Sequence, residues 1–138
     1  TLLGKSYNGF APLGPAITTK DEIPDPYTLQ VRFWVDGELR QDFGTDDMGH
    51  NIARCIEYFS SRTPVKPGDV LFLGTNHQGL SPLQDGSKAE MEITGLGRLT
   101  FDVVDPLKRS WPKGKDTEIA NNALNRIQQY QASAAAKQ

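Results

Sequence analysis

The stretch "LQVRFWVDGELRQDF", residues 29–43, decides how the chain begins to fold. Along residues 29–35 apolar side chains alternate with others, and this period of two predicts a strand with one buried face. Asp36 and Gly37 then supply the two positive-φ positions of a tight hairpin turn. Residues 38–43 are therefore expected to form the second arm of a hairpin, as an edge strand or a more exposed one.

Two further elements are expected after the hairpin. A short amphipathic helix is predicted where apolar residues recur at helical spacing, with Asp47 or Asn51 as its cap. Residues 70–73 form a continuous apolar run after a Pro-Gly-Asp turn, which predicts a strand covered on both faces and ended by Gly74. The apolar residues that predict the helix are Ile52, Cys55, Ile56 and Phe59.

A second antiparallel pair is predicted from residue 88 onward. Ala89, Met91 and Ile93 fall on one side of a strand, and Gly95-Leu96-Gly97 turns it back into a strand over residues 99–104. Residues 28–104 are thus mostly antiparallel or mixed β with one short helix, and the expected fold class is α+β.

The chain changes character at residue 105. A polar connector with prolines leads to a helix that Asp116 or Thr117 caps and that runs through about residue 131. Its apolar stripe is thin, which indicates packing on a neighbouring surface such as another subunit. We therefore expect two parts, residues 1–104 and residues 105–138. The stripe consists of Ile119, Ala123, Leu124 and Ile127.

Composition excludes several classes of function. The 138 residues fit one domain, and the net charge of −2 comes without a cluster of Lys and Arg among aromatics, which argues against nucleic-acid binding. The sequence contains no run of 18 apolar residues, so no membrane-spanning helix is predicted. One cysteine, Cys55, and two histidines give no zinc-ligand spacing. The single cysteine also suits a reducing compartment, so the cytoplasm is the expected location.

Lys5 is the first candidate for chemistry, because it lies among Gly, Pro and Phe in "LGKSYNGFAPLGP", residues 3–15. A lysine that loses hydration either lowers its pKa or binds an anion, such as an acidic substrate or an enolate oxygen. The alternative is an ammonium group that lies in water near the start of the chain.

A second candidate is "FLGTNHQG", residues 72–79. Gly74 and Thr75 end an apolar run, where backbone N–H groups and a hydroxyl are available to a carboxylate, although the glycine has an equally good explanation in turn geometry. His77 is a possible general base, or simply a solvated loop histidine. Glu90 and Glu92 share one strand face, where carboxylates are more often solvent-facing than catalytic.

Five stretches, in this order, resemble the later part of the catalytic domain of the fumarylacetoacetate hydrolase family. The resemblance implies a β-roll-like fold that forms homodimers. It also implies an enzyme of aromatic-compound catabolism that binds a diketo or 2-oxo acid with Mg²⁺, or Mn²⁺ or Ca²⁺ in its place. The stretches are "GKSYNGFAPLGP", "DEIPDP", "VDGELRQDFGTDDM", "PVKPGDVLFLGT" and "AEMEITGLGRL".

The resemblance also implies roles for single residues. Lys5 would contact the substrate oxygens, and Gly74 and Thr75 would hold the substrate carboxylate. Glu92 would support acid–base chemistry. His77 stands where the family commonly has a different loop, which leaves the identity of the substrate open.

The resemblance places the metal ligands outside this chain. In the family a Glu-x-Glu pair and an Asp bind the metal, and they lie upstream of the stretch that carries Lys5. Here that position falls upstream of Thr1, so none of the chain's own residues is expected to be a metal ligand. The metal is expected only where a longer polypeptide or a separate chain supplies the upstream segment.

Three functions follow as hypotheses. The first is a divalent-metal-dependent hydrolase that cleaves a carbon–carbon bond in an acylpyruvate-like acid through an enolate stabilised by Lys5, with water activated by His77 or Glu92. The second is a decarboxylase, tautomerase, isomerase or hydratase of a 2-oxo acid. The third is a metal-free relative that serves as an interaction module, with the C-terminal helix as its binding element.

Overall fold

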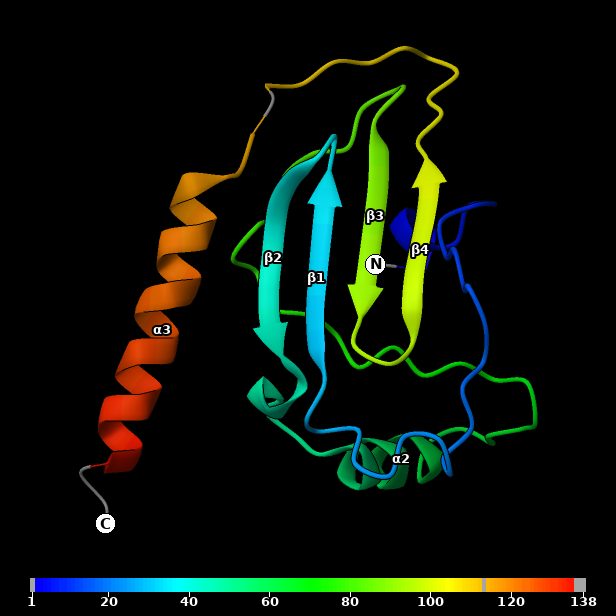
Figure 1. The fold of residues 1–138 in the computed structure, drawn as a ribbon, viewed down its shortest axis with the longest axis vertical. Coiled ribbons are helices and arrows are strands. Elements are labelled where there is room, and N and C mark those ends of the chain that lie inside the picture. The colour runs from blue at the N-terminus through cyan, green and yellow to red at the C-terminus, as the bar shows by residue number, and fades with distance from the viewer. Residues whose placement is uncertain (1, 113, 136–138) are drawn as a thin grey trace.

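The computed structural model describes residues 2–112 and 114–135, and it contains the predicted hairpin (Figure 1). Strand β1 (Gln30–Val35) pairs antiparallel with β2 (Glu38–Gly44). The turn residues Asp36 and Gly37 have φ values of 52° and 80°. Both lie in the left-handed region that a two-residue hairpin turn requires, so the local prediction is confirmed.

Two more strands complete a four-stranded antiparallel sheet with the order β2-β1-β3-β4. Strand β3 (Lys88–Ile93) pairs with β1, and β4 (Gly97–Asp102) pairs with β3. Strand β2 is thus an edge strand, as the sequence predicted. Together with the helices, this sheet confirms the expected α+β class.

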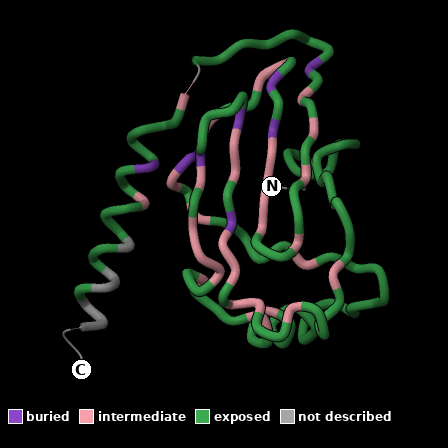
Figure 2. The backbone as a smooth tube through the Cα atoms, viewed as in Figure 1, coloured by how far each residue is buried: buried purple, intermediate pink, exposed green. Residues whose placement is uncertain are grey.

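The register gives the sheet one apolar face. Val31 lies opposite Ile93 and Phe33 opposite Met91, while Val35 lies opposite Ala89. Val35 and Ala89 are only 3% and 0% exposed, so the core lies where β1 and β3 pair near the hairpin turn (Figure 2). Alternation along both strands places all of these side chains on the same side of the sheet.

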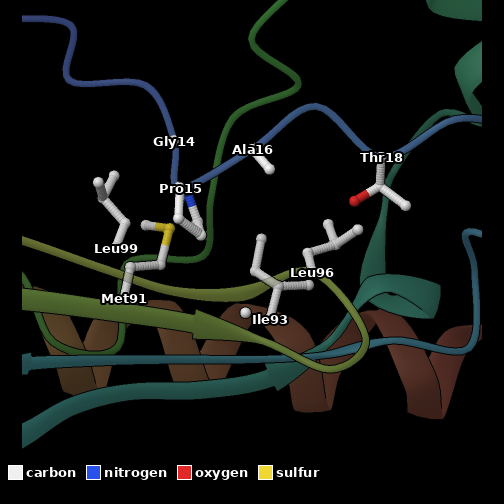
Figure 3. A pocket seen from close by; sticks show the side chains of 9 residues that line it. Gly14, Pro15, Ala16, Thr18, Met91, Ile93, Leu96 and Leu99 are labelled. Carbon is white, nitrogen blue, oxygen red and sulfur yellow. The ribbon is translucent and has the colours of Figure 1, made fainter.

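An N-terminal segment covers part of this face. Residues 14–18 pass over the β3–β4 hairpin, and Gly14, Pro15, Ala16 and Thr18 line a small open pocket of about 140 Å³ with Met91, Ile93, Leu96 and Leu99 (Figure 3). Gly97 has a φ of +89°, and a Cβ there would lie 3.2 Å from Cγ of Pro15. Glycine is therefore required at Gly97 both by the turn and by the close approach of Pro15.

The two longer helices begin where the sequence predicted. Besides a short α1 (Leu2–Lys5) and a 3-10 turn (Thr45–Asp47), the chain forms α2 (Ile52–Ser60) and α3 (Thr117–Ala135). Asn51 caps α2, because its Oδ1 accepts from the Arg54 N–H at 2.8 Å. Asp116 caps α3 by accepting from the Ile119 N–H at 2.9 Å. Among the described residues, none of these helices is long and apolar enough to cross a bilayer.

The predicted strand over residues 70–73 is wrong for this chain. The segment is irregular, and Val70 is 55% and Phe72 67% exposed. A covered strand needs partners for its backbone groups and layers over both faces. Within the described residues neither exists, because the sheet ends at β2 and β4. The apolar stripe of α3 is also open, with Ile119 and Leu124 each 41% exposed, while the side chain of Ile127 lies outside the described residues.

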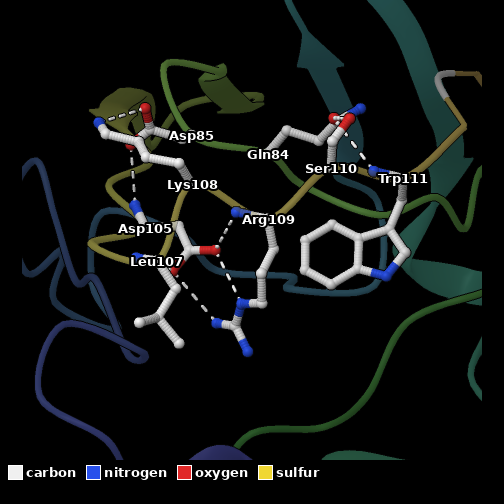
Figure 4. A network of polar contacts seen from close by, with 8 residues as sticks. All are labelled: Gln84, Asp85, Asp105, Leu107, Lys108, Arg109, Ser110 and Trp111. Carbon is white, nitrogen blue, oxygen red and sulfur yellow. Dashed lines mark hydrogen bonds and ion pairs between the residues drawn. The ribbon is translucent and has the colours of Figure 1, made fainter.

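Polar contacts attach the connector after β4 to the loop before β3 (Figure 4). The Asp105 carboxylate accepts from the backbone N–H of Leu107 and from Nε of Arg109, the latter at 2.9 Å. Asp85 accepts from the Asp105 N–H and from Nζ of Lys108, at 2.9 and 2.6 Å. We call this group the C-terminal clasp; it consists of Gln84, Asp85, Asp105, Leu107, Lys108, Arg109, Ser110 and Trp111.

The clasp should loosen in acid. Hydrogen bonding to Arg109 holds the pKa of Asp105 at about 2, below the ordinary 3.8. A carboxylate whose pKa is lowered on folding stabilises the folded state above its unfolded pKa, and this stabilisation disappears as the pH falls from about 4 to about 2. Asp105→Asn should remove the Asp105 part of that dependence, while Asp85, whose pKa is also lowered by hydrogen bonding to Lys108, keeps its own. The variant should also loosen the clasp at neutral pH, as measured by amide hydrogen exchange of residues 107–111. The exposed Asp102→Asn is the control, and slow exchange retained in Asp105→Asn would contradict the assignment.

Candidate functional site

A loop that carries three of the predicted site residues is attached to edge strand β2. The side-chain amide of Gln41 donates from Nε2 to the Asn76 carbonyl oxygen at 2.6 Å. The Thr75 hydroxyl donates to Gln41 Oε1 at 3.2 Å. One side chain thus bonds two successive residues of the loop, and we call residues 74–79 the edge loop.

A β-bulge explains how Gln41 comes to face this loop. Phe33 pairs with Gln41 and Trp34 with Leu39, so Arg40 is an extra residue without a partner on β1. A bulge bends the strand locally and re-aims its side chains. The Arg40 side chain is only 7% exposed, and its Nη2 lies 3.1 Å from a Glu38 carboxylate oxygen. Its buried Nε and Nη1 have no hydrogen-bond partner among the described residues.

Gly79 supplies the second attachment of the edge loop. It is buried, and a Cβ at this position would collide with the backbone carbonyl of Arg40. Only a glycine lets the loop backbone lie this close to the bulge. At the start of the loop, Gly74 has a φ of +87° with open space where a Cβ would be, so its requirement is conformational rather than steric. Gly74 and Thr75 are both exposed.

The other predicted residues lie apart from this loop's contacts. Lys5 ends α1 and is exposed, so the residues described for this chain do not withdraw it from water as expected from its apolar neighbours in sequence. Tyr7 and Phe10 contact each other in a tilted arrangement, with ring centroids 5.4 Å apart. His77 is exposed within the edge loop.

Glu92 belongs to a set of ion pairs on the polar face of the sheet. Its carboxylate lies 3.7 Å from Nη1 of Arg98 and 4.0 Å from Nη1 of Arg32. Arg98 also pairs with Glu90 at 3.2 Å and lies over the Trp34 ring. Exposed pairs of this kind each contribute about 0–1 kcal/mol. In this chain Glu92 therefore has the solvent-facing ionic environment that its alternation on a strand predicted.

Of the five predicted residues, the structure brings together Gly74, Thr75 and His77, which are neighbours in sequence. Within residues 2–112 and 114–135 no hydrogen bond or ion pair joins Lys5, Thr75 and Glu92 to one another. Sequence reasoning missed Gln41 and the bulge at Arg40. The available signal was the charged Arg40, which a two-residue hairpin without a bulge would place opposite Phe33 on the apolar face.

A divalent cation does not fit the residues that the structure describes. None of their His, Cys, Asp and Glu side chains gather in groups of three or more that could hold a metal ion. The metal ligands were expected upstream of Thr1, and Thr1 itself lies outside the described residues, so their location stays a prediction. We therefore derive no step through a metal bound by the described residues alone.

Comparison with protein families identifies residues 1–104 as a match to the model described as "Fumarylacetoacetate (FAA) hydrolase C-terminal". A curated relative is the 4-hydroxyphenylacetate degradation bifunctional isomerase/decarboxylase of Salmonella dublin. The two are 40% identical over 100 residues, which cover 72% of this chain and 23% of that protein. The chain thus spans only a fraction of this relative's length.

Solved structures give the same answer. The maleylpyruvate hydrolase of Sphingobium sp. SYK-6 matches with a TM-score of 0.71 and 36% identity over 75% of this chain and 39% of that one. That enzyme has also been solved with a manganese(II) ion and pyruvate. The 5-carboxymethyl-2-hydroxymuconate delta-isomerase of Mycobacterium smegmatis matches with a TM-score of 0.66 and 37% identity, covering 71% and 38%. These findings confirm the resemblance read from the five sequence stretches.

The close approach at Gly79 generates a stability prediction. Gly79→Ala should destabilise the protein by about 1–3 kcal/mol, because the added methyl meets rigid backbone at Arg40. Gly49→Ala, where a Cβ meets open space, is the matched control and should change the free energy of unfolding by less than about 0.5 kcal/mol. Urea unfolding of both variants checks the expectation. Equal midpoints for the two would show that the edge loop does not rest on the bulge.

Proposed function

The chain belongs to the fumarylacetoacetate hydrolase family, and on that premise we propose that it is the later part of the catalytic domain of an enzyme for diketo or 2-oxo acids. The reaction proposed is hydrolysis of a carbon–carbon bond in an acylpyruvate-like acid. The family match over residues 1–104 carries this proposal, and the named relatives, a hydrolase, an isomerase and an isomerase/decarboxylase, support it.

In this proposal the edge loop receives the substrate's acid group. Exposed Gly74 and Thr75 offer backbone N–H groups at a fixed place beside β2, where the Thr75 hydroxyl donates to Gln41. A carboxylate is an acceptor-only group, and hydrogen bonds from such donors are among the stronger ones in proteins. The loop's role is to orient the 2-oxo acid, so that the bond to be broken points toward the reacting water.

Lys5 is proposed to stabilise the enolate. A base, His77 or Glu92, takes a proton from water, and the resulting hydroxide adds to the distal carbonyl carbon. The carbon–carbon bond then breaks, and its electron pair passes into the enolate of the 2-oxo acid fragment. A cation at the enolate oxygen lowers the energy of this step, and more so where the surroundings exclude water. Because Lys5 is exposed here, that exclusion would come from protein beyond the described residues.

A divalent cation, Mg²⁺ or Mn²⁺ or Ca²⁺, is proposed as the cofactor. The support comes from the relative solved with manganese(II) and pyruvate. Its ligands would come from a segment upstream of Thr1 or from a separate chain, since the described residues hold no suitable group. When bound, the ion would supply positive charge to the oxygens of the 2-oxo acid.

Replacing Lys5 tests the enolate role. In the complete enzyme that contains this chain, Lys5→Met should lower kcat about 100- to 1,000-fold with folding intact, because one well-placed charge on a developing oxyanion is lost. Lys20→Met, at another exposed lysine of the N-terminal segment, is the control and should retain kcat. Turnover close to wild type in Lys5→Met would refute the role.

The second candidate reaction is isomerisation or decarboxylation of a 2-oxo acid, with tautomerisation or hydration as variants. The bifunctional isomerase/decarboxylase and the muconate isomerase among the relatives favour it. The enolate and the roles of Lys5 and Thr75 are common to both candidates. Product analysis with acylpyruvate, oxaloacetate and oxo-dienoate substrates separates them, since only hydrolysis yields two shorter acids.

A third candidate is a non-catalytic module that binds another protein. All three candidates include contact of this chain with further protein. Large apolar side chains such as Phe72 (67% exposed) and Val104 (76%) are open in the chain by itself. Exposed apolar surface of this kind is typical of protein–protein contacts. We propose a cytoplasmic homodimer in which further protein, from the same polypeptide or a separate chain, covers these residues.

Metal titration distinguishes the enzyme from the interaction module. Calorimetric titration of Mg²⁺ or Mn²⁺ into the complete protein should show saturable micromolar binding if the enzyme proposal holds. The chain of residues 1–138 by itself is the control, and it should show none in that range because its described side chains form no three-ligand group. An absence of saturable binding in the complete protein would favour the interaction module.

A further inference from the structure

We propose that Gln41 is a positioning residue for the substrate carboxylate, acting through its hold on the edge loop. The proposal rests on the proposed function, and it adds a residue for which the sequence motifs gave no role. Gln41 does not touch the substrate in this proposal. It fixes Thr75 and Asn76, and through them the donors that meet the acid group.

The orientation of the Gln41 amide follows from its partners. The Asn76 carbonyl oxygen can only accept a hydrogen bond, so the nitrogen of the Gln41 amide must face it, at 2.6 Å. Oε1 of Gln41 is then left for Thr75, and the Thr75 hydroxyl must donate its hydrogen there, at 3.2 Å. The pair of bonds sets both the position of Thr75 and the direction of its hydroxyl.

This direction decides which groups remain for a carboxylate. While the Thr75 hydrogen points at Gln41, the hydroxyl offers only lone pairs to a ligand. A carboxylate also offers only lone pairs, so the edge loop must meet it with backbone N–H groups. Gln41 therefore holds Thr75 in one position, and the Thr75 hydroxyl is not available as a donor to the substrate.

The loop depends on Gln41 because its own bonds are weak. The Gln78 N–H reaches Asn76 Oδ1 at 3.4 Å, near the limit for a hydrogen bond. Among the described residues, the buried Nδ2 of Asn76 has no partner at all. The short bond from Gln41 is thus the strongest contact that holds Asn76, and the bulge at Arg40 supports it from the strand side.

Gln41→Leu tests the proposal in the complete enzyme. Loss of the two bonds should raise KM for a 2-oxo acid about tenfold and leave kcat within about threefold of wild type. For the corresponding neutral 2-oxo amide, KM should not change. Gln30→Leu is the matched control: Gln30 lies in the same hairpin and donates to Asp42 from Nε2 at 2.5 Å, and among the described residues its side chain has no hydrogen bond to the edge loop. Its KM values should equal those of wild type.

The outcomes separate this inference from the function on which it rests. If the wild-type enzyme is active and Gln41→Leu has the same KM as Gln30→Leu, the positioning role is overturned. The proposed function then still stands. Equal losses for the acid and the amide also overturn it, since they indicate a general structural defect. Wild-type enzyme without turnover on any 2-oxo acid overturns both. If Gln41→Leu does not fold, Gln41→Met, which keeps the length of the side chain without its polar atoms, takes its place.

Discussion

Strand β1 exchanges backbone hydrogen bonds with β2 on one side and β3 on the other, and the order of the sheet follows from this double pairing. The register of β1 with β3 buries Val35 and Ala89 and orients one apolar face of the sheet. A shift by one residue would carry each of these side chains to the polar face, where Arg32, Glu92 and Arg98 now form ion pairs. Burial of one face therefore fixes the register, and the register fixes the edges.

The candidate site lies at an edge because only an edge strand leaves room for a loop beside it. Strand β2 has no further strand on its outer side among the described residues, and the bulge at Arg40 turns Gln41 toward residues 75 and 76. Gly79 closes the arrangement by lying against the Arg40 backbone. In this proposal the rigid sheet supports the edge loop, and the loop contacts the substrate. Binding residues on loops that a rigid scaffold positions are common in enzymes.

The part of the chain beyond the family match is held differently. Residues 105–111 are attached through carboxylates, a guanidinium and backbone N–H groups, and the start of α3 bonds back to Leu80 through the Asp116 N–H at 2.8 Å. Little apolar surface is buried along α3, where Ala120 is the buried apolar residue among the described side chains. This attachment depends on charge and hydrogen bonding, and α3 lies on the β2 side of the sheet (Figure 1).

The sequence by itself determined the elements whose signals are local: the hairpin turn at Asp36 and Gly37, the helix caps at Asn51 and Asp116, and the alternation that gives each strand its inner face. It also determined the family, since each of the five stretches that resemble it is a short, unbroken run of residues. Only the tertiary structure decided that residues 70–73 remain unpaired, that Arg40 forms a bulge, and that Gln41 holds Thr75. The physical reason is range: turns and caps are satisfied within a few residues, whereas the hold of Gln41 on Asn76 depends on a partner 35 residues away. The bulge depends on how the two strands pair along their length, which no local signal fixes.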